Sequence, residues 1–281
     1  MAHLLSVDYH ERQQLYDKAL ALREEGLGPW RIADLIGVNR NTVGGWIYGR
    51  TKPSPVWNLK ELNECPELSY VLGVAIGDGT AQCTLNTKGK RTYMVILQTH
   101  EQEFAQIFSE AASKIFKGGY HAKITSINTV YGLRYICTIR SKQLYLLCKK
   151  GVPSTITEKY PAMFLRGFYD AEGCVTFSWR GGRLYKKVIL SNCSHDLIQY
   201  CREKLAEIGI PTTIHVAHIE GKTKLAKDGH YIISRKPMYY LGIGKKKAII
   251  NFAKSVGFSL SRKKQKLIML LNELDKINGR W

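Results

Sequence analysis

The sequence predicts an α+β protein in which an αββαββα unit occurs twice, preceded by a small domain made only of helices. Three observations indicate this. Residues 71–79 and 165–173 are similar segments, and each ends in an acidic residue followed by glycine. Apolar and polar residues alternate after each segment, as is typical of half-buried strands. Near the N-terminus, two short helical stretches flank the tight turn Gly37-Val38.

The two similar segments predict a pair of helices in close contact. Gly73 and Gly77 in the first segment, like Gly167 and Ala171 in the second, are four residues apart and so share one helix face. A face without large side chains lets two backbones approach each other closely. Each helix is expected to end at the glycine that closes its segment, because glycine suits a C′ position.

Asp78 and Glu172 are predicted to be the last residues of these two helices. Both carboxylates would then emerge at the same end of the packed pair, where the negative pole of each helix dipole lies. Two carboxylates gathered there repel each other unless a cation joins them, so the pattern predicts a divalent metal site. The alternative interpretation, two ordinary helix-end acids, requires an unfavourable placement to occur twice.

The paired segments resemble the repeated motif of the LAGLIDADG homing endonucleases, in the single-chain form with two repeats. The second segment matches the motif throughout, whereas the first has Ile76 at the usual position of a non-catalytic acid. The resemblance covers about residues 66–281. It implies a monomer with a pseudo-twofold homing-endonuclease fold and two antiparallel sheets, with repeats at residues 66–155 and 156–281.

The resemblance implies a site-specific enzyme that hydrolyses both strands of double-stranded DNA and leaves short 3′ overhangs. Hard oxygen ligands that remain open to water and phosphate suit Mg²⁺, and Mn²⁺ is expected to substitute for it. The predicted metal site comprises Asp78 and Glu172, together with Gly77 and Ala171, the residue before each acid.

Two further catalytic positions follow from the resemblance. In the family, a glutamine near the end of the second strand and a lysine near the later helices approach the site. Gln98 matches the glutamine, and Ser191 is its counterpart in the second repeat. Lys263 and Lys264 both match the lysine, and the sequence does not choose between them. A solvated basic helix start is the alternative interpretation of the lysine pair.

Residues 1–50 are predicted to form a helix-turn-helix DNA-binding domain, joined to the repeats by a linker at residues 51–65 that contains two prolines at 53 and 55. Asn39 is suited to cap the third helix. The N-terminal residues of that helix, Arg40, Asn41 and Thr42, would then enter the major groove. A three-helix bundle without DNA contacts is the alternative interpretation.

The charge of the chain favours a polyanionic partner. Lys and Arg number 42 against 23 Asp and Glu, a formal net charge of +19, and an excess of this size is typical of nucleic-acid binding. No apolar run is long enough to span a bilayer. Polar side chains on the predicted strands are expected to face DNA, although the solvated side of a sheet is the alternative. These residues are Gln82, Thr84, Asn86, Lys88, Arg134, Thr176, Ser178 and Arg180.

The seven cysteines show no CxxC spacing and are interpreted as buried free thiols in a reducing, intracellular compartment. The cytoplasm or nucleoid is expected, with an organelle left open. The chain neither begins nor ends with the residues of protein splicing, so an intron-encoded or free-standing enzyme is expected. The alternatives are an RNA maturase that assists intron splicing, with RNA as its partner, and an inactive relative that regulates transcription.

Overall fold

The computed structural model describes residues 9–53, 62–85, 87, 89, 91–116, 120, 122–219, 221, 223–225, 231–233 and 235–278. The predicted DNA-contact residues Asn86 and Lys88 lie outside these ranges. The chain divides into two compact units, Met1–Leu62 with Phe116–Tyr120, and Asn63–Ile115 with His121–Trp281. Within the described ranges, no helix has both the length and the apolar character needed to cross a membrane.

The smaller unit contains three short helices around one core. They are α1 (Tyr9–Glu24), α2 (Pro29–Ile36) and α3 (Arg40–Ile47). Ala19, Ile32 and Val43 are fully buried, and the ring of Trp46 packs edge-on against Tyr16 at 5.7 Å. Gly37 closes α2 in the left-handed conformation, with φ at 68°. The predicted cap of the third helix is confirmed, because the side chain of Asn39 accepts a hydrogen bond from the backbone N–H at position 41.

The first half of the larger unit is a helix, two strands, a helix, two strands and a helix. The elements are α4 (Pro66–Gly77), β1 (Gly79–Leu85), β2 (Arg91–Thr99), α5 (Gln102–Lys114), β3 (Lys123–Thr129), β4 (Gly132–Arg140) and α6 (Lys142–Lys150). The strands form one sheet in the order β1-β2-β4-β3, and every pairing is antiparallel.

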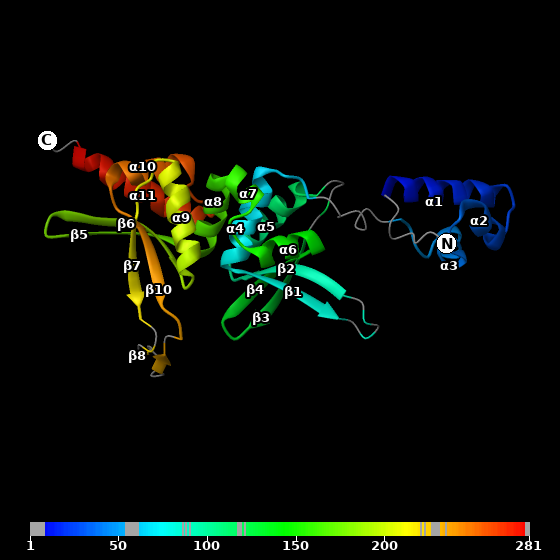
Figure 1. The fold of residues 1–281 in the computed structure, drawn as a ribbon, viewed down its shortest axis with the longest axis horizontal. Helices are drawn as coiled ribbons and strands as arrows, with labels where there is room; N and C mark the ends of the chain where they lie inside the picture. Colours follow the sequence, from blue (N-terminus) through cyan, green and yellow to red (C-terminus); the bar gives the residue numbers. More distant parts are fainter. Residues whose placement is uncertain are drawn as a thin grey trace. The chain divides into compact units, whose positions relative to one another are not determined.

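The second half repeats this plan after the short helix α7 (Thr155–Lys159). Its elements are α8 (Pro161–Glu172), β5 (Gly173–Arg180), β6 (Arg183–Asn192), α9 (His195–Glu207), β7 (Thr213–His218), β10 (Met238–Ile243), α10 (Lys246–Ser255) and α11 (Ser261–Asn278). The antiparallel sheet has the matching order β5-β6-β10-β7. The predicted α+β fold, a duplicated αββαββα unit with two antiparallel sheets, is therefore confirmed (Figure 1).

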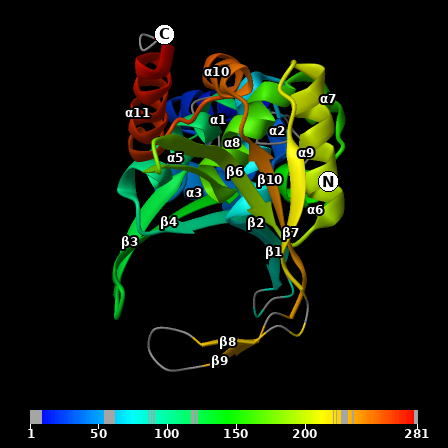
Figure 2. The same cartoon turned by 90° about the vertical axis from the view of Figure 1, so that its left-hand side faces the viewer.

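The second half also has an addition that the first half lacks. In the first sheet, β3 and β4 are joined by the short turn at Val130 and Tyr131, both strongly exposed. In the second sheet, the matching connection from β7 to β10 carries the strands β8 (Thr223–Leu225) and β9 (Tyr231–Ile233), which among the described strands pair only with each other. The duplication is thus inexact at this edge of the sheet (Figure 2).

The helices of the larger unit cover one face of each sheet (Figure 2). Along β2 and β4, Val95, Leu97, Cys137 and Ile139 are fully buried on that face. The residues between them form the opposite face, which no helix of the described residues covers. We call this second face of each sheet its open face. Because the strands place alternate residues on opposite faces, the polar residues predicted on β1, β4 and β5 can be assigned to one face directly.

Candidate active site and nucleic-acid interface

The helices α4 and α8 contact each other through their glycines. A Cβ atom at Gly73 would overlap the backbone of α8, and a Cβ atom at Gly167 would overlap the backbone of α4. A Cβ atom at Gly77 would lie 2.5 Å from the Cβ of Ala171. The predicted contact between two small-residue faces is confirmed, and we call it the glycine seam. It brings the C-terminal ends of the two helices together.

The glycines that follow the two acids are required because the chain passes close to the preceding helix turn. Gly79 and Gly173 are not among the glycines with a positive φ, and Gly173 is extended, with φ −91° and ψ 152°. A Cβ atom at Gly79 would lie 2.5 Å from the Cα of Ala75, and one at Gly173 would lie 2.5 Å from the carbonyl oxygen of Tyr169. Each strand therefore leaves its helix too close to the last turn for a side chain. As predicted, α8 ends at Glu172, directly before Gly173, whereas α4 ends one residue earlier than predicted, at Gly77, with Asp78 as its C-cap.

Asp78 and Glu172 lie together at the end of the glycine seam. Asp78 is the C-cap of α4, with its N–H bonded to the carbonyl oxygen of Val74 at 3.0 Å, and Glu172 is the last residue of α8. Partial burial raises the pKa of both carboxyls, and the charge of Asp78 raises the pKa of Glu172 further. The two acids thus repel each other in the way that a shared cation would relieve.

Lys263 approaches the two acids, whereas Lys264 is exposed. The Lys263 side chain is buried, and its Nζ donates to the carbonyl oxygens of Tyr169 at 3.2 Å, Asp170 at 2.6 Å and Ala171 at 3.2 Å. The ammonium therefore occupies the negative end of α8, a favourable place for a cation. Burial lowers the pKa of Lys263, and its charge lowers the pKa of Asp78 and Glu172 in turn.

Asp170 is a residue of the site that the sequence interpretation missed. It is 1 % exposed, and its carboxyl accepts hydrogen bonds from Tyr70 Oη at 2.9 Å, the Ser259 N–H at 3.0 Å and the Leu260 N–H at 3.4 Å. Burial raises the pKa of Asp170. These bonds hold the loop that leads into α11 and so position Lys263. An acid between Tyr169 and Ala171, where the first repeat has Ile76, was the available signal.

A second set of contacts ties the start of α11 to the first repeat. Arg262 Nη2 lies 2.7 Å from Glu101 Oε1, and the Ser261 N–H donates to Glu103 Oε1 at 3.1 Å. Glu101 and Glu103 are at the start of α5, so these bonds join both repeats beside the acids. The charge of Glu101 also raises the pKa of Asp78, after burial and against the effect of Lys263.

The strand register places Gln98 at the level of Asp78, one position beyond the last pair of β1 and β2. Leu97 pairs with Gly79, and Gln98 follows it on the open face, where its side chain is exposed. Ser191 follows Leu190, which pairs with Gly173 in the same way. The next residue in the second repeat, Asn192, was missed by the sequence interpretation. Its Nδ2 donates to Glu172 Oε1 at 3.2 Å, and no sequence pattern distinguishes it from other polar strand ends.

The predicted DNA-contact residues of the first sheet lie on its open face. Gln82 and Thr84 on β1 pair with Met94 and Thr92 on β2, and alternation puts all four on the same face as Gln98. Thr84 is exposed and Gln82 is half-buried. Arg134, half-buried on β4, lies on this face as well, because it alternates with the buried residues Cys137 and Ile139.

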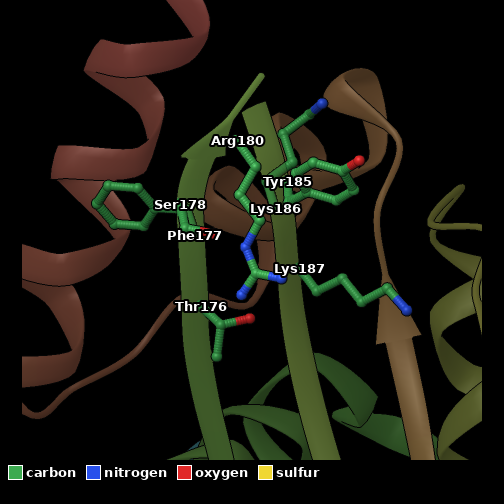
Figure 3. A pocket seen from close by; sticks show the side chains of 7 residues that line it. All are labelled: Thr176, Phe177, Ser178, Arg180, Tyr185, Lys186 and Lys187. Atoms are coloured by element: carbon green, nitrogen blue, oxygen red, sulfur yellow. The ribbon is translucent and has the colours of Figure 1, made fainter. Parts of the chain in front are cut away.

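The predicted residues of the second sheet line a groove. Thr176, Ser178 and Arg180 are exposed on the open face of β5, and the groove has a volume of about 350 Å³. Figure 3 shows the Arg180 side chain extending along the two strands toward Thr176, while Phe177 points away from it. The remaining lining residues, Tyr185, Lys186 and Lys187, come from β6. Lys187 pairs with Thr176 on the open face, whereas Lys186 pairs with Phe177 on the opposite face. The open face of this sheet thus carries Arg180 and Lys187, positive charges that suit contact with phosphates.

The three predicted DNA contacts of the smaller unit differ in their surroundings. Asn41 is exposed, whereas Thr42 is half-buried. Arg40 lies 3.3 Å from Asp34, and its guanidinium stacks over the ring of Trp30 at 4.9 Å. Trp30 is exposed, 68 % accessible, and its ring lies beside Arg40 in the first turn of α3. The sequence interpretation did not include this residue.

The donor set at the acids suits a hard cation with open coordination positions. In the described part of the chain, no three His, Cys, Asp or Glu residues are grouped to hold a metal. Two carboxylates at one end of the seam could supply two ligands, leaving the others to backbone, water or phosphate oxygens, as is usual for Mg²⁺. The predicted ligand Ala171 already accepts a hydrogen bond from Lys263 through its carbonyl oxygen, which competes with a metal at that atom.

The surroundings of the cysteines correct one prediction. Within the described residues all seven are free thiols, but Cys83, Cys174 and Cys193 are exposed, and only Cys137 and Cys201 are fully buried. The prediction of buried thiols was wrong for the exposed three, because two of them lie on strands with solvent on at least one side.

Two matching sheets joined by a glycine seam, with an acid at the end of each seam helix, define a duplicated LAGLIDADG fold. Residues 159–257 match the family model of the LAGLIDADG-like domain. The chain therefore contains a LAGLIDADG-like domain in its second repeat and has the fold of the single-chain LAGLIDADG homing endonucleases.

The chain is also similar to known proteins over longer stretches than residues 159–257. The uncharacterized protein MJ0398 of Methanocaldococcus jannaschii is 28% identical over 285 residues, which cover 98% of this chain and all of that protein. The LAGLIDADG homing endonuclease I-GzeII, solved in complex with its DNA target, has a TM-score of 0.50 and 10% identity over 76% of this chain and 92% of its own. I-DmoI, solved with DNA and Mn, has a TM-score of 0.47 and 19% identity over 69% and 97% of the two chains.

Proposed function

We propose that this chain is a site-specific, divalent-metal-dependent endonuclease of the homing type, which acts as a monomer on double-stranded DNA. It would cut both strands and leave short 3′ overhangs, with Mg²⁺ as cofactor or Mn²⁺ in its place. We also propose that it is intron-encoded or free-standing. The observation that carries the proposal is the pair of acids, Asp78 and Glu172, which converge at the end of the glycine seam with Lys263 beside them.

The surfaces around the acids support a DNA substrate. The open faces of both sheets carry the polar residues described above, and the chain has a formal net charge of +19. A two-stranded ribbon fits the major groove and can read base edges there. The fold shared with I-GzeII, which was solved with its DNA target, supports the same class of substrate. In this proposal the two sheets follow one duplex, and each acid faces a phosphate of one strand.

Each residue at the site has a role in this proposal. Asp78 and Glu172 would hold the cation through their carboxylate oxygens, and Gly77 would contribute at the same end of α4. A bound divalent cation would stabilise charge on the attacking and leaving oxygens of the phosphodiester. Lys263 would lower the negative potential at the acids, and Gln98 would orient the attacking water from the open face.

The smaller unit would extend the contact with DNA. We propose residues 1–50 as a helix-turn-helix domain, residues 51–65 as its linker, and residues 66–155 and 156–281 as the two repeats. Arg40, Asn41 and Thr42 lie in the first turn of α3, which is the part of a recognition helix that reaches base edges.

Cleavage of a randomised DNA library tests the proposal without knowledge of the target. Incubation with the full chain and Mg²⁺ or Mn²⁺, followed by sequencing of the cut ends, is expected to return one extended site with staggered ends. A double variant, Asp78→Asn with Glu172→Gln, is the matched control and should return none. If no DNA is cut in either metal, including an intact intron-insertion site, the nuclease proposal fails. Specific binding of intron RNA by such an inactive chain would instead indicate a maturase.

A further inference from the structure

Asn192 contacts one of the two acids and has both ends of its amide occupied. It is the last residue of β6 and is half-buried. Its Nδ2 donates to Glu172 Oε1 at 3.2 Å, and its Oδ1 accepts the backbone N–H of Ser194 at 2.9 Å. Only one oxygen of the Glu172 carboxylate has this contact, which leaves Oε2 free of it.

The second contact fixes the direction of the amide. The oxygen and nitrogen of an asparagine side chain are assigned from their partners, because their shapes are nearly the same. A backbone N–H can only donate, so the atom that faces Ser194 must be Oδ1. The NH₂ group must then face Glu172. The turn at residues 192–194, which leads into α9, therefore holds a hydrogen-bond donor against this carboxylate.

Asp78 has no matching donor in the described part of the chain. Gly79 pairs with Leu97 and Gly173 pairs with Leu190, so the strand register makes Thr99 the counterpart of Asn192. The Thr99 hydroxyl accepts the N–H of Glu101 at 3.1 Å and thus belongs to the start of α5. The two acids are therefore alike in position but differ in what orients them.

We propose that Asn192 is a positioning residue for Glu172, one that makes the two halves of the site unequal. The inference rests on the proposed nuclease function. In that reaction a water oxygen bonds to phosphorus, the bond from phosphorus to the 3′ oxygen breaks, and the 3′ oxygen takes up a proton. Asn192 fixes the free oxygen of Glu172 toward the reacting phosphate. Loss of Asn192 should then impair the hydrolysis of one strand more than that of the other.

Strand-resolved cleavage tests this inference. A duplex that carries a selected site, with a different dye on each strand, is cut by the full chain in Mg²⁺. Asn192→Ala is expected to slow one strand by about 10–100-fold relative to the other, the usual cost of losing a partner that orients a metal ligand. Asn192→Asp can still accept the Ser194 N–H but brings a like charge to Glu172, so it should slow the same strand. The ratio of two rates within one sample does not depend on the folded fraction.

Thr99→Val is the matched control, because it removes the counterpart side chain without touching Glu172. It is not expected to slow the strand that Asn192→Ala slows, relative to the other strand. DNA affinity without divalent metal should be equal in all four proteins. Equal slowing of both strands by Asn192→Ala, or no slowing, would overturn the role of Asn192. If the wild-type chain cuts no DNA, Mn²⁺ affinity measured without DNA decides: Asn192→Ala should weaken it about 10–100-fold, and an unchanged affinity overturns the inference.

Discussion

At the scale of single residues, the surroundings of the two acids indicate how much activity depends on each of them. Asp78 and Glu172 are partly buried, and the charge of Asp78 raises the pKa of Glu172, so both acids are expected to be needed at the proposed cation site. Asp78→Ala or Glu172→Ala is expected to reduce the cleavage rate by more than about 100-fold. Loss of a residue that only orients a metal ligand costs less, about 10–100-fold. Binding of uncut DNA without metal should persist, because the open faces are unchanged. A rate that falls only slightly in either variant would put the metal elsewhere.

The lysine pair offers a test between neighbours. Lys263 is buried against three carbonyl oxygens of α8, whereas Lys264 is exposed. Lys263→Met is expected to lower the single-turnover rate by roughly 100-fold, as for removal of one group that stabilises transition-state charge. Lys264→Met should alter only the salt dependence of DNA binding. Similar losses in the two variants would mean that the residues act as general basic surface.

At the scale of elements, the glycine seam limits what α4 and α8 can carry. Gly167→Ala would drive a methyl group into the backbone of α4, and overpacking of this kind costs about 1–3 kcal/mol or more. The urea midpoint of the larger unit should fall accordingly. Gly244→Ala is the control, because its nearest neighbour outside the adjacent residues is 3.8 Å away. Equal midpoints for the two variants would show that the seam can widen without cost.

The helices α7 and α9 are joined by an ion pair whose effect depends on pH. Lys204 Nζ lies 2.6 Å from Glu158 Oε2, and this bond lowers the pKa of Glu158 and raises that of Lys204. The stability from Glu158 is present above its unfolded pKa, about 4.3, and is lost as pH falls through the lower folded value. Glu158→Gln should therefore reduce Tm at pH 7 and have little effect near pH 3. Glu203→Gln, which also lies on α9, is the control. An equal loss of Tm at both pH values in Glu158→Gln would contradict the assignment of this pH dependence to the ion pair.

The sequence was sufficient for elements that depend on local patterns. The small-residue spacing in residues 71–79 and 165–173 predicted the seam, and alternation predicted the open faces that carry Thr84 and Arg180. Contacts between distant segments were not accessible in the same way. Asp170 bonds to Ser259, 89 residues away, and Asn192 reaches Glu172 only because two strands pair in one register. The extended Gly173 shows a further limit, since glycine suits both a left-handed turn and a close approach.

At the scale of the whole molecule, the net charge and the smaller unit should affect the affinity for DNA more than they affect the rate of cleavage. A chain that begins near Ser54 is expected to cleave the same site but to bind it more weakly at raised salt. Each lost phosphate contact should reduce the slope of log affinity against log salt by about 0.9. Nuclease footprints of both chains give the second measurement, with a shorter protected region on one side for the truncated chain. Identical footprints and slopes would assign the smaller unit to another partner.

The strands β8 and β9 occur in the second repeat and have no equivalent in the first. A molecule with exact twofold symmetry would sit on a palindromic duplex in two indistinguishable orientations. Here, rotation by half a turn would put the connection that carries β8 and β9 in the place of the short turn at Val130 and Tyr131. In the proposed function the two orientations on a duplex would therefore not be equivalent. The proposed DNA site would then have a defined left and right end, and its two halves would not need to be related by inversion.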